Sequence, residues 1–206
     1  MERDLDLTLS FPFRLAILSL TVLFWLVLFF IINRRPVEPE CRLDLATSLD
    51  RRIPFVPVLA LVYFSTYPFV LQPFFILTNA RWFYWMLACF ISITLFSGLI
   101  HAVVPSKIER VEEMDAGGIT GWGLRLFQKI CKPHGNFPSM HVGLSVPVVI
   151  VNFMVGGSLV GVLTLVWGIS IALSTLFTKQ HYILDVLAGV AGGLVIVLLT
   201  YQLMMV

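Results

Sequence analysis

Long apolar stretches separated by short polar ones run along the whole chain. Each is long enough to cross a bilayer once as a helix, and the six stretches lie near residues 13–32, 54–78, 82–105, 141–157, 159–178 and 182–205. Only residues 33–52 and 106–140 form polar segments of any size, and no internal repeat or linker divides the chain. The pattern predicts an all-α, polytopic membrane protein with six transmembrane helices, built as a single domain over residues 1–206.

One apolar region is too long for a single crossing. Residues 142–178 contain no charged side chain. At about 1.5 Å per residue, one helix of that length far exceeds a hydrocarbon core of roughly 30 Å, whereas two helices of roughly 18 residues each just cross it. We expect the turn at Gly156-Gly157-Ser158, so that Lys179-Gln180-His181 returns to the membrane face that holds Pro138-Ser139-Met140-His141.

The composition agrees with membrane insertion. Hydrophobic residues make up 58% of the chain and charged residues 13%, and the mean hydropathy is +0.92; these values exclude a soluble domain. The formal net charge of +2 comes from dispersed basic residues, so nothing indicates a nucleic-acid partner. We expect a multi-pass integral protein of the cell membrane or an endomembrane, with the bilayer as its surroundings.

The sidedness of the membrane stays open. The loops after the first, third and fifth stretches hold eleven of the 14 Lys and Arg residues, which favours a cytoplasmic position for these loops. Basic residues that bind an anionic substrate would be counted in the same way, however. Two of the three cysteines, Cys41 and Cys131, fall on this face, where a disulfide and two free thiols are both compatible with the sequence.

His181 and Asp185 stand four residues apart at the start of the sixth stretch. A helix places such a pair on one face. A carboxylate that accepts from one ring nitrogen fixes the tautomer and leaves the other nitrogen with a lone pair, as a nucleophile or general base requires. The alternative is an ion pair at a helix start, but ionisable residues at the mouth of a membrane helix are costly without a function.

Ser139 and His141 lie where the fourth stretch begins. Unpaired backbone N–H groups and the helix dipole favour an anion there, although Ser139 is also a suitable N-cap. Two imidazoles, one carboxylate, one hydroxyl and the cation of Lys179 on one membrane face suit in-line phosphoryl transfer through a covalent phosphohistidine.

The segments 136–141 and 174–185 resemble the second and third motifs of the type 2 phosphatidic acid phosphatase superfamily, and they are more similar to its branch with inositol phosphorylceramide and sphingomyelin synthases. The resemblance implies that His181 is the nucleophile, that Asp185 orients it, that His141 protonates the leaving oxygen and that Ser139 holds a phosphate oxygen. It also implies catalysis without a metal or other cofactor, and the sequence has no acidic cluster of the kind that Mg²⁺ sites use.

The chain departs from the family pattern in its cations. The third motif usually begins Ser-Arg, but here Thr175 follows Ser174, and we expect Lys179 to supply the missing phosphate-binding charge. The first motif, Lys-x6-Arg-Pro, is not found. Lys107 and Arg110 are the nearest basic residues, either as phosphate ligands or as ordinary charges at a membrane edge.

The polar segment 106–140 contains an amphipathic pattern and one of two further histidines. Ile119, Trp122, Leu126 and Ile130 recur at helical spacing, which predicts an interfacial segment between the third and fourth membrane helices. His134 in this segment, and His101 near the end of the third stretch, are interpreted as loop and packing residues rather than catalytic ones.

The sequence leads to a membrane lipid phosphate phosphatase, with a lipid phosphate as substrate. The alternative with the same first step is a lipid phosphotransferase that passes the phosphoryl or phospho-headgroup to a lipid or polyol hydroxyl. Two further alternatives are a metal-binding oxidase or carrier, with His141, His181, Asp185 and in one version His101 as ligands, and a non-enzymatic transporter. Such oxidases need more ligands than four histidines supply, and carriers usually show two related halves with broken helices.

Overall fold

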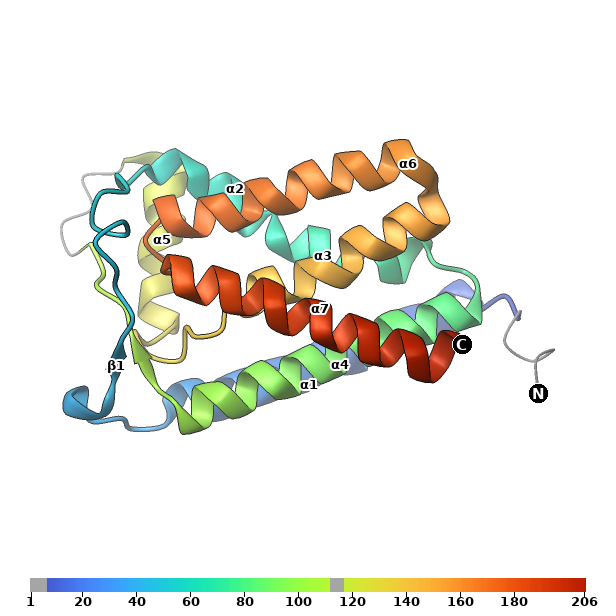
Figure 1. The fold of residues 1–206 in the computed structure, drawn as a ribbon, viewed down its shortest axis with the longest axis horizontal. Helices are drawn as coiled ribbons and strands as arrows, with labels where there is room; N and C mark the ends of the chain where they lie inside the picture. Colours follow the sequence, from blue (N-terminus) through green and yellow to red (C-terminus); the bar gives the residue numbers. More distant parts are fainter. Residues whose placement is uncertain (1–6, 112–116) are drawn as a thin grey trace.

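The computed structural model describes residues 7–111 and 117–206, and it is mostly helical (Figure 1). Within these residues, five helices are long and apolar enough to cross a membrane. They are α1 (Phe11–Arg34), the segment Pro57–Ile76, α4 (Ala80–Val103), α6 (Met140–Phe177) and α7 (Ile183–Met205). The predicted helical membrane architecture is therefore confirmed in outline, and the ends of these five helices lie within a few residues of those expected.

The longest helix, α6, contains a sharp bend at Gly157. This glycine has φ 78° and ψ 177°, a backbone conformation that side-chain-bearing residues rarely adopt. Figure 1 shows the two halves of α6 running back alongside each other, and Gly161 packs so closely that a Cβ there would lie 2.2 Å from Phe153. The predicted turn is present. By length and composition α6 still counts as one candidate span, so the number of six crossings stays a prediction.

The second apolar stretch, expected as one helix over 54–78, consists of three shorter pieces. They are the 3-10 helix η2 (Pro57–Leu59), α2 (Ala60–Phe64) and α3 (Thr66–Ile76). At the junction, Ser65 Oγ donates to Val62 O at 2.6 Å and Thr66 Oγ1 donates to Tyr63 O at 2.7 Å. Hydroxyls that bond to carbonyls in the preceding turn compete with regular helix geometry, and this break sets the direction of the tyrosines in this segment.

The polar segments gather at one end of the helix bundle (Figure 1). A short 3-10 helix, η1 (Pro39–Cys41), precedes β1 (Leu43–Asp44), which pairs in parallel with β2 (Ser106–Lys107). This two-stranded pair was not predicted, because two residues are too few to leave a period-2 pattern. The helix α5 (Gly118–Ile130) also lies at this end, and its Ile119 and Trp122 are 74% and 61% exposed.

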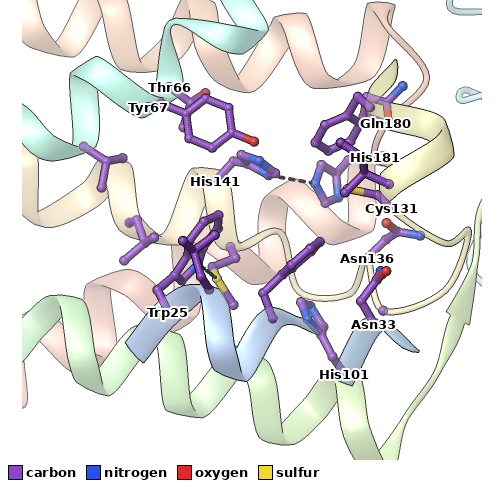
Figure 2. Close-up of a pocket in the computed structure, with 18 of the residues that line it drawn as sticks. Trp25, Asn33, Thr66, Tyr67, His101, Cys131, Asn136, His141, Gln180 and His181 are labelled. Carbon is purple, nitrogen blue, oxygen red and sulfur yellow. Dashed lines mark hydrogen bonds between the residues drawn. The ribbon is translucent and has the colours of Figure 1, made fainter. Parts of the chain in front are cut away.

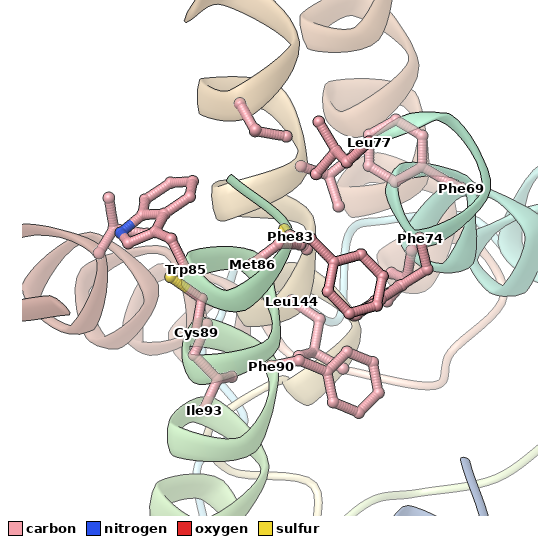
Figure 3. Packing of buried hydrophobic residues seen from close by; sticks show 14 of the residues in the cluster. Phe69, Phe74, Leu77, Phe83, Trp85, Met86, Cys89, Phe90, Ile93 and Leu144 are labelled. Atoms are coloured by element: carbon pink, nitrogen blue, oxygen red, sulfur yellow. The ribbon is translucent and has the colours of Figure 1, made fainter. Parts of the chain in front are cut away.

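An aromatic core joins α3, α4, α6 and α7 (Figure 3). Phe74 contacts the rings of Phe83 and Phe90 edge to face, with centroids 5.7 and 5.9 Å apart. In a membrane, where lipid is as apolar as the side chains, close packing of this kind and small residues hold helices together. Such a core makes the bundle a rigid support for the polar end.

Two glycines bring α7 against the start of α6. A Cβ at Gly189 would lie 2.5 Å from Ser139 O, and one at Gly193 would lie 2.8 Å from Gly143 O. Only glycine permits this approach, since a side chain would collide with the α6 backbone. The contact places the first turns of the two helices side by side, and these turns carry the histidines of the candidate site.

Candidate active site

The hairpin of α6 brings the two histidines together. His141 Nδ1 lies 3.4 Å from His181 Nε2, although 40 residues separate them in the chain. Figure 2 shows the two rings facing each other in a cavity, with Tyr67 of α3 and Trp25 of α1 on opposite sides of His141. The predicted meeting of the two histidines on one face of the bundle is thus present in the structure.

His181 and Asp185 form the expected pair. His181 Nδ1 lies 3.3 Å from Asp185 Oδ2, and the two side chains are 6% and 1% exposed. The same carboxylate oxygen accepts the backbone N–H of Tyr182 at 2.8 Å. Because a carboxylate only accepts, the neutral imidazole carries its proton on Nδ1 and presents the Nε2 lone pair toward His141. This is the orientation that a nucleophile needs.

The backbone around His181 is held from behind. The N–H groups of Gln180 and His181 donate to the backbone carbonyl of Thr175 at 2.9 and 3.2 Å, so the end of α6 anchors this turn. Asp50 Oδ1 accepts the N–H of Ile183 at 2.8 Å. These bonds fix the ring of His181 in place before any ligand binds.

Lys179 belongs to this support and does not line the cavity. Its ammonium donates to the carbonyls of Asp50 at 2.9 Å and Ile53 at 2.5 Å, and burial lowers its pKa. Lys179 also has φ 54°, a left-handed conformation that costs energy for a residue with a Cβ. The structure therefore does not bring Lys179 to the phosphate position expected for it, because loop 50–53 binds its charge on the other side of His181.

Arg110 is the predicted cation that does reach the cavity. Its guanidinium donates to Gln128 O at 2.6 Å and to Cys131 O. Burial lowers the pKa of Arg110, yet a guanidinium stays protonated in proteins. Lys107, by contrast, pairs with Asp44 at 3.0 Å, which raises its pKa, and it lies outside the cavity.

Ser139 is fully buried beside the His181–Asp185 pair. Its N–H donates to Asp185 O at 2.9 Å, which ties the start of α6 to α7. Within the described part of the chain, its Oγ has no hydrogen-bond partner, and it does not line the cavity wall. A buried hydroxyl without a partner is uncommon. The structure thus places Ser139 next to the His181–Asp185 pair but not on the wall of the cavity.

The cavity has a volume of about 430 Å³ and two chemically different ends. The histidines, Arg110 and Asn136 occupy the polar end. The other end is apolar, and α1 and α3 supply Val22, Trp25, Leu26, Phe29, Phe30, Val70 and Leu71. Leu26, Phe30 and Tyr67 line the cavity and are also 36%, 37% and 37% exposed. The apolar end therefore reaches the outer surface of the bundle between α1 and α3.

Several polar residues of the site were not identified from the sequence. The Tyr63 hydroxyl lies 3.4 Å from His141 Nε2, and Asn136 has a buried side-chain nitrogen without a partner among the described residues. Asn136 is the first residue of segment 136–141, so the family resemblance could have identified it as a site residue. Tyr63 gave none, because it is one aromatic residue in an apolar stretch.

The remaining histidines also line the cavity. His101 Nε2 lies 2.9 Å from Pro138 O, so this nitrogen donates and carries the proton. His134 is 4% exposed, and burial lowers its pKa. Within residues 7–111 and 117–206, no three His, Cys, Asp or Glu side chains form a group that could hold a metal ion. All three cysteines are free thiols.

Comparison with known families agrees with this arrangement. Residues 105–206, about half of the chain, match the family model of the PAP2 superfamily. The match covers segments 136–141 and 174–185. It supports the resemblance to type 2 phosphatidic acid phosphatases but does not distinguish a branch of that superfamily. Members of this superfamily are phosphoric-ester hydrolases or phosphotransferases. No curated protein and no solved structure matches the chain. Together with the five long apolar helices found among the described residues, the family match shows an integral membrane protein.

Proposed function

We propose that the protein is a membrane lipid phosphate phosphatase that acts through a phosphohistidine on His181. The observation that carries the proposal is the buried chain from Asp185 through His181 to His141, with separations of 3.3 and 3.4 Å. It joins a carboxylate, a nucleophile with a free lone pair and a proton donor at the polar end of an otherwise apolar cavity. That combination suits a substrate with a charged head and an apolar tail.

In the first step, His181 Nε2 attacks phosphorus in line with the leaving oxygen. The N–P bond forms as the P–O bond breaks, and His141 gives its proton to the leaving oxygen. Asp185 keeps the Nδ1 proton hydrogen-bonded and stabilises the positive charge that develops on the ring. The phosphoryl group has to enter between the two imidazoles, so the direct contact of 3.4 Å belongs to the ligand-free site.

In the second step, water attacks the phosphohistidine and the N–P bond breaks. His141, now without its extra proton, accepts one from the water, and phosphate leaves. We assign the phosphate-binding charge to Arg110, because a preorganised guanidinium stabilises the equatorial oxygens of the transition state. The Ser139 hydroxyl and the Asn136 amide, which lack partners among the described residues, are the neutral donors that complete the set.

The apolar end of the cavity supports a lipid as substrate. Aromatic and aliphatic side chains of α1 and α3 line it, and the exposed edges of Leu26 and Phe30 open it toward the bilayer. A lipid tail can stay in apolar surroundings while its headgroup reaches His181. In this arrangement both halves of α6 cross the membrane, which gives six crossings, and α5 lies at the interface with Ile119 and Trp122 in the lipid headgroup region.

Water and an alcohol are both possible acceptors for the phosphohistidine. The similarity of the two motifs to the synthase branch favours a phosphotransferase as the second candidate, and the apolar cavity could hold the tail of a lipid acceptor. Hydrolysis is the simpler outcome, since it needs no second lipid in a cavity of about 430 Å³.

The proposal is tested with purified protein and a panel of lipid monophosphates, diphosphates and phosphodiesters. Phosphate release from a lipid monophosphate, abolished in His181→Ala, is the expected result. A labelled lipid incubated with and without lipid alcohols separates the two acceptors by their products. If no phosphorylated lipid in the panel is turned over, the proposed function is wrong.

A further inference from the structure

We propose that Tyr63 is a positioning residue that holds the catalytic acid, His141, in both of its protonation states. This inference rests on the proposed function. Tyr63 belongs to α2, is 1% exposed, and its hydroxyl lies 3.4 Å from His141 Nε2. Its ring packs against the His141 ring and edge to face on Phe127, with centroid distances of 5.1 and 5.4 Å.

The direction of each hydrogen bond follows from Asp185. The carboxylate accepts, so His181 Nδ1 donates and His181 Nε2 accepts. His141 Nδ1 must then donate to His181, which leaves His141 Nε2 as an acceptor in the neutral ring. Only a donor can bind that nitrogen, and the Tyr63 hydroxyl is the group within reach. A single sequence of donors therefore runs from Tyr63 through both histidines to Asp185.

A tyrosine suits this position better than a charged residue. Before it protonates the leaving oxygen, His141 carries a proton on both nitrogens, and Nε2 then needs an acceptor. A hydroxyl can donate to the neutral ring and accept from the charged one. A carboxylate cannot donate to Nε2 of the neutral ring in the ligand-free site, and an ammonium cannot accept from Nε2 of the charged ring. Tyr63 can serve both states without moving from its packed position.

Substrate binding is expected to strengthen this contact. The two nitrogens of His141 point in divergent directions from the ring, toward His181 and toward Tyr63, and both contacts are long at 3.4 Å. A phosphoryl group that enters between the histidines moves the His141 ring away from His181. That movement shortens the distance to Tyr63 and makes its hydroxyl the orienting partner when the proton is transferred.

The hydroxyl is not required for packing. The neighbours of the ring, Phe64 and Phe127, are apolar, and a phenylalanine would fill the same volume. Among the described residues, the Tyr63 hydroxyl makes its hydrogen-bond contact with His141. A buried hydroxyl on an apolar wall is unfavourable without its partner, so its presence points to His141.

Tyr63→Phe tests the proposal, with Tyr67→Phe as its matched control. Tyr67 also lines the cavity and contacts the His141 ring edge to face at 6.3 Å, but it is the Tyr63 hydroxyl, not that of Tyr67, that meets His141 Nε2. Turnover is measured on a lipid phosphate with an alkoxide leaving group and on an aryl phosphate whose leaving group needs no proton.

We expect Tyr63→Phe to lower kcat on the lipid phosphate about tenfold, on the scale of one lost hydrogen bond, with KM and aryl phosphate turnover unchanged. Tyr67→Phe should not lower kcat selectively. In a His141→Ala background, Tyr63→Phe should add no further loss, since it acts through His141. Equal losses on both substrates, or a full additional loss in the double variant, would overturn the proposal. Retained aryl phosphate turnover in Tyr63→Phe shows that the phosphohistidine mechanism stands independently of Tyr63.

Discussion

Two polar regions meet at His181, and their hydrogen bonds differ. On the cavity side, His181 and its neighbours His141, Asp185 and Tyr63 are joined by contacts of 3.3–3.4 Å. Behind His181, the bonds from Lys179 to loop 50–53 and from Ile183 to Asp50 measure 2.5–2.9 Å. Lys179 and Asp50 have short hydrogen bonds without a ligand, whereas the contacts on the cavity side are longer.

This difference distinguishes residues that hold the backbone in place from residues that can bind the substrate. A group whose hydrogen bonds are short and complete gains little from a ligand, because binding would break existing bonds. A group with long contacts can exchange them for bonds to a phosphate. By this criterion His141 is a candidate for chemistry, while Lys179 and Asp50 hold the backbone that carries His181. Arg110 also makes short bonds to carbonyls, but it lines the cavity and its Nε has no partner among the described residues. The following substitutions test that division.

The largest loss is expected from His141→Ala. Without the acid that protonates the leaving oxygen, turnover of a lipid phosphate should fall by about 10²–10⁴-fold. An aryl phosphate should suffer much less, because its leaving group departs without a proton. The rates of phosphoenzyme formation on the two substrates measure the effect. Equal losses on the two substrates would show that His141 is not the acid, and would weaken the distinction between the cavity-side residues and the supporting residues behind His181.

Asp185→Asn is expected to reduce kcat by about 10²–10³-fold, as for the loss of one preorganised stabilising group. His181 Nδ1 and the Tyr182 N–H both converge on the single oxygen Oδ2, so an amide oxygen can replace it and keep the tautomer. The loss then reports on the negative charge alone. Asp44→Asn, which removes the carboxylate paired with Lys107, is the control and should turn over substrate normally. Wild-type rates for Asp185→Asn would leave the carboxylate as a structural cap.

Arg110 and Lys179 provide the direct comparison between the two regions. Arg110→Gln should lower kcat/KM by about 10²-fold, because it removes a charged donor from the cavity, and Arg110→Lys should retain more activity. Lys179→Gln should leave kcat/KM of the folded protein close to wild type. The substitution should instead lower the free energy of unfolding by about 1–3 kcal/mol, because the bonds from Lys179 to two carbonyls are lost. Unfolding in detergent measures this change. The reverse outcome, with Lys179 kinetically dominant, would restore it as the phosphate ligand.

The sequence was sufficient for features that depend on spacing. The turn at Gly157 follows from comparing a charge-free stretch with the thickness of a bilayer, and the pairing of His181 with Asp185 follows from the helical repeat. Both need only local information. The meeting of His141 with His181 then follows from the turn, since a hairpin returns the chain to the face it started from.

Other features depend on contacts that no spacing reveals. Lys179 binds carbonyls 126 and 129 residues away, and Tyr63 lies 78 residues from His141 in the chain. The left-handed backbone at Lys179 turns its side chain toward loop 50–53, which charge alone cannot indicate. The break at Ser65 depends on bonds from its hydroxyl and that of Thr66 to carbonyls in the preceding turn, and two hydroxyl residues in a mostly apolar stretch do not by themselves indicate a break.

The central claim is that His181 forms the covalent intermediate, and trapping that intermediate tests it most directly. Protein incubated briefly with a radiolabelled lipid phosphate and quenched in alkali should carry label on His181, with stability typical of a phosphohistidine. His181→Ala should carry none, whereas Lys179→Gln, folded and assayed in parallel, should be labelled like the wild type. Label that persists in His181→Ala, or that maps to another residue, would contradict the account.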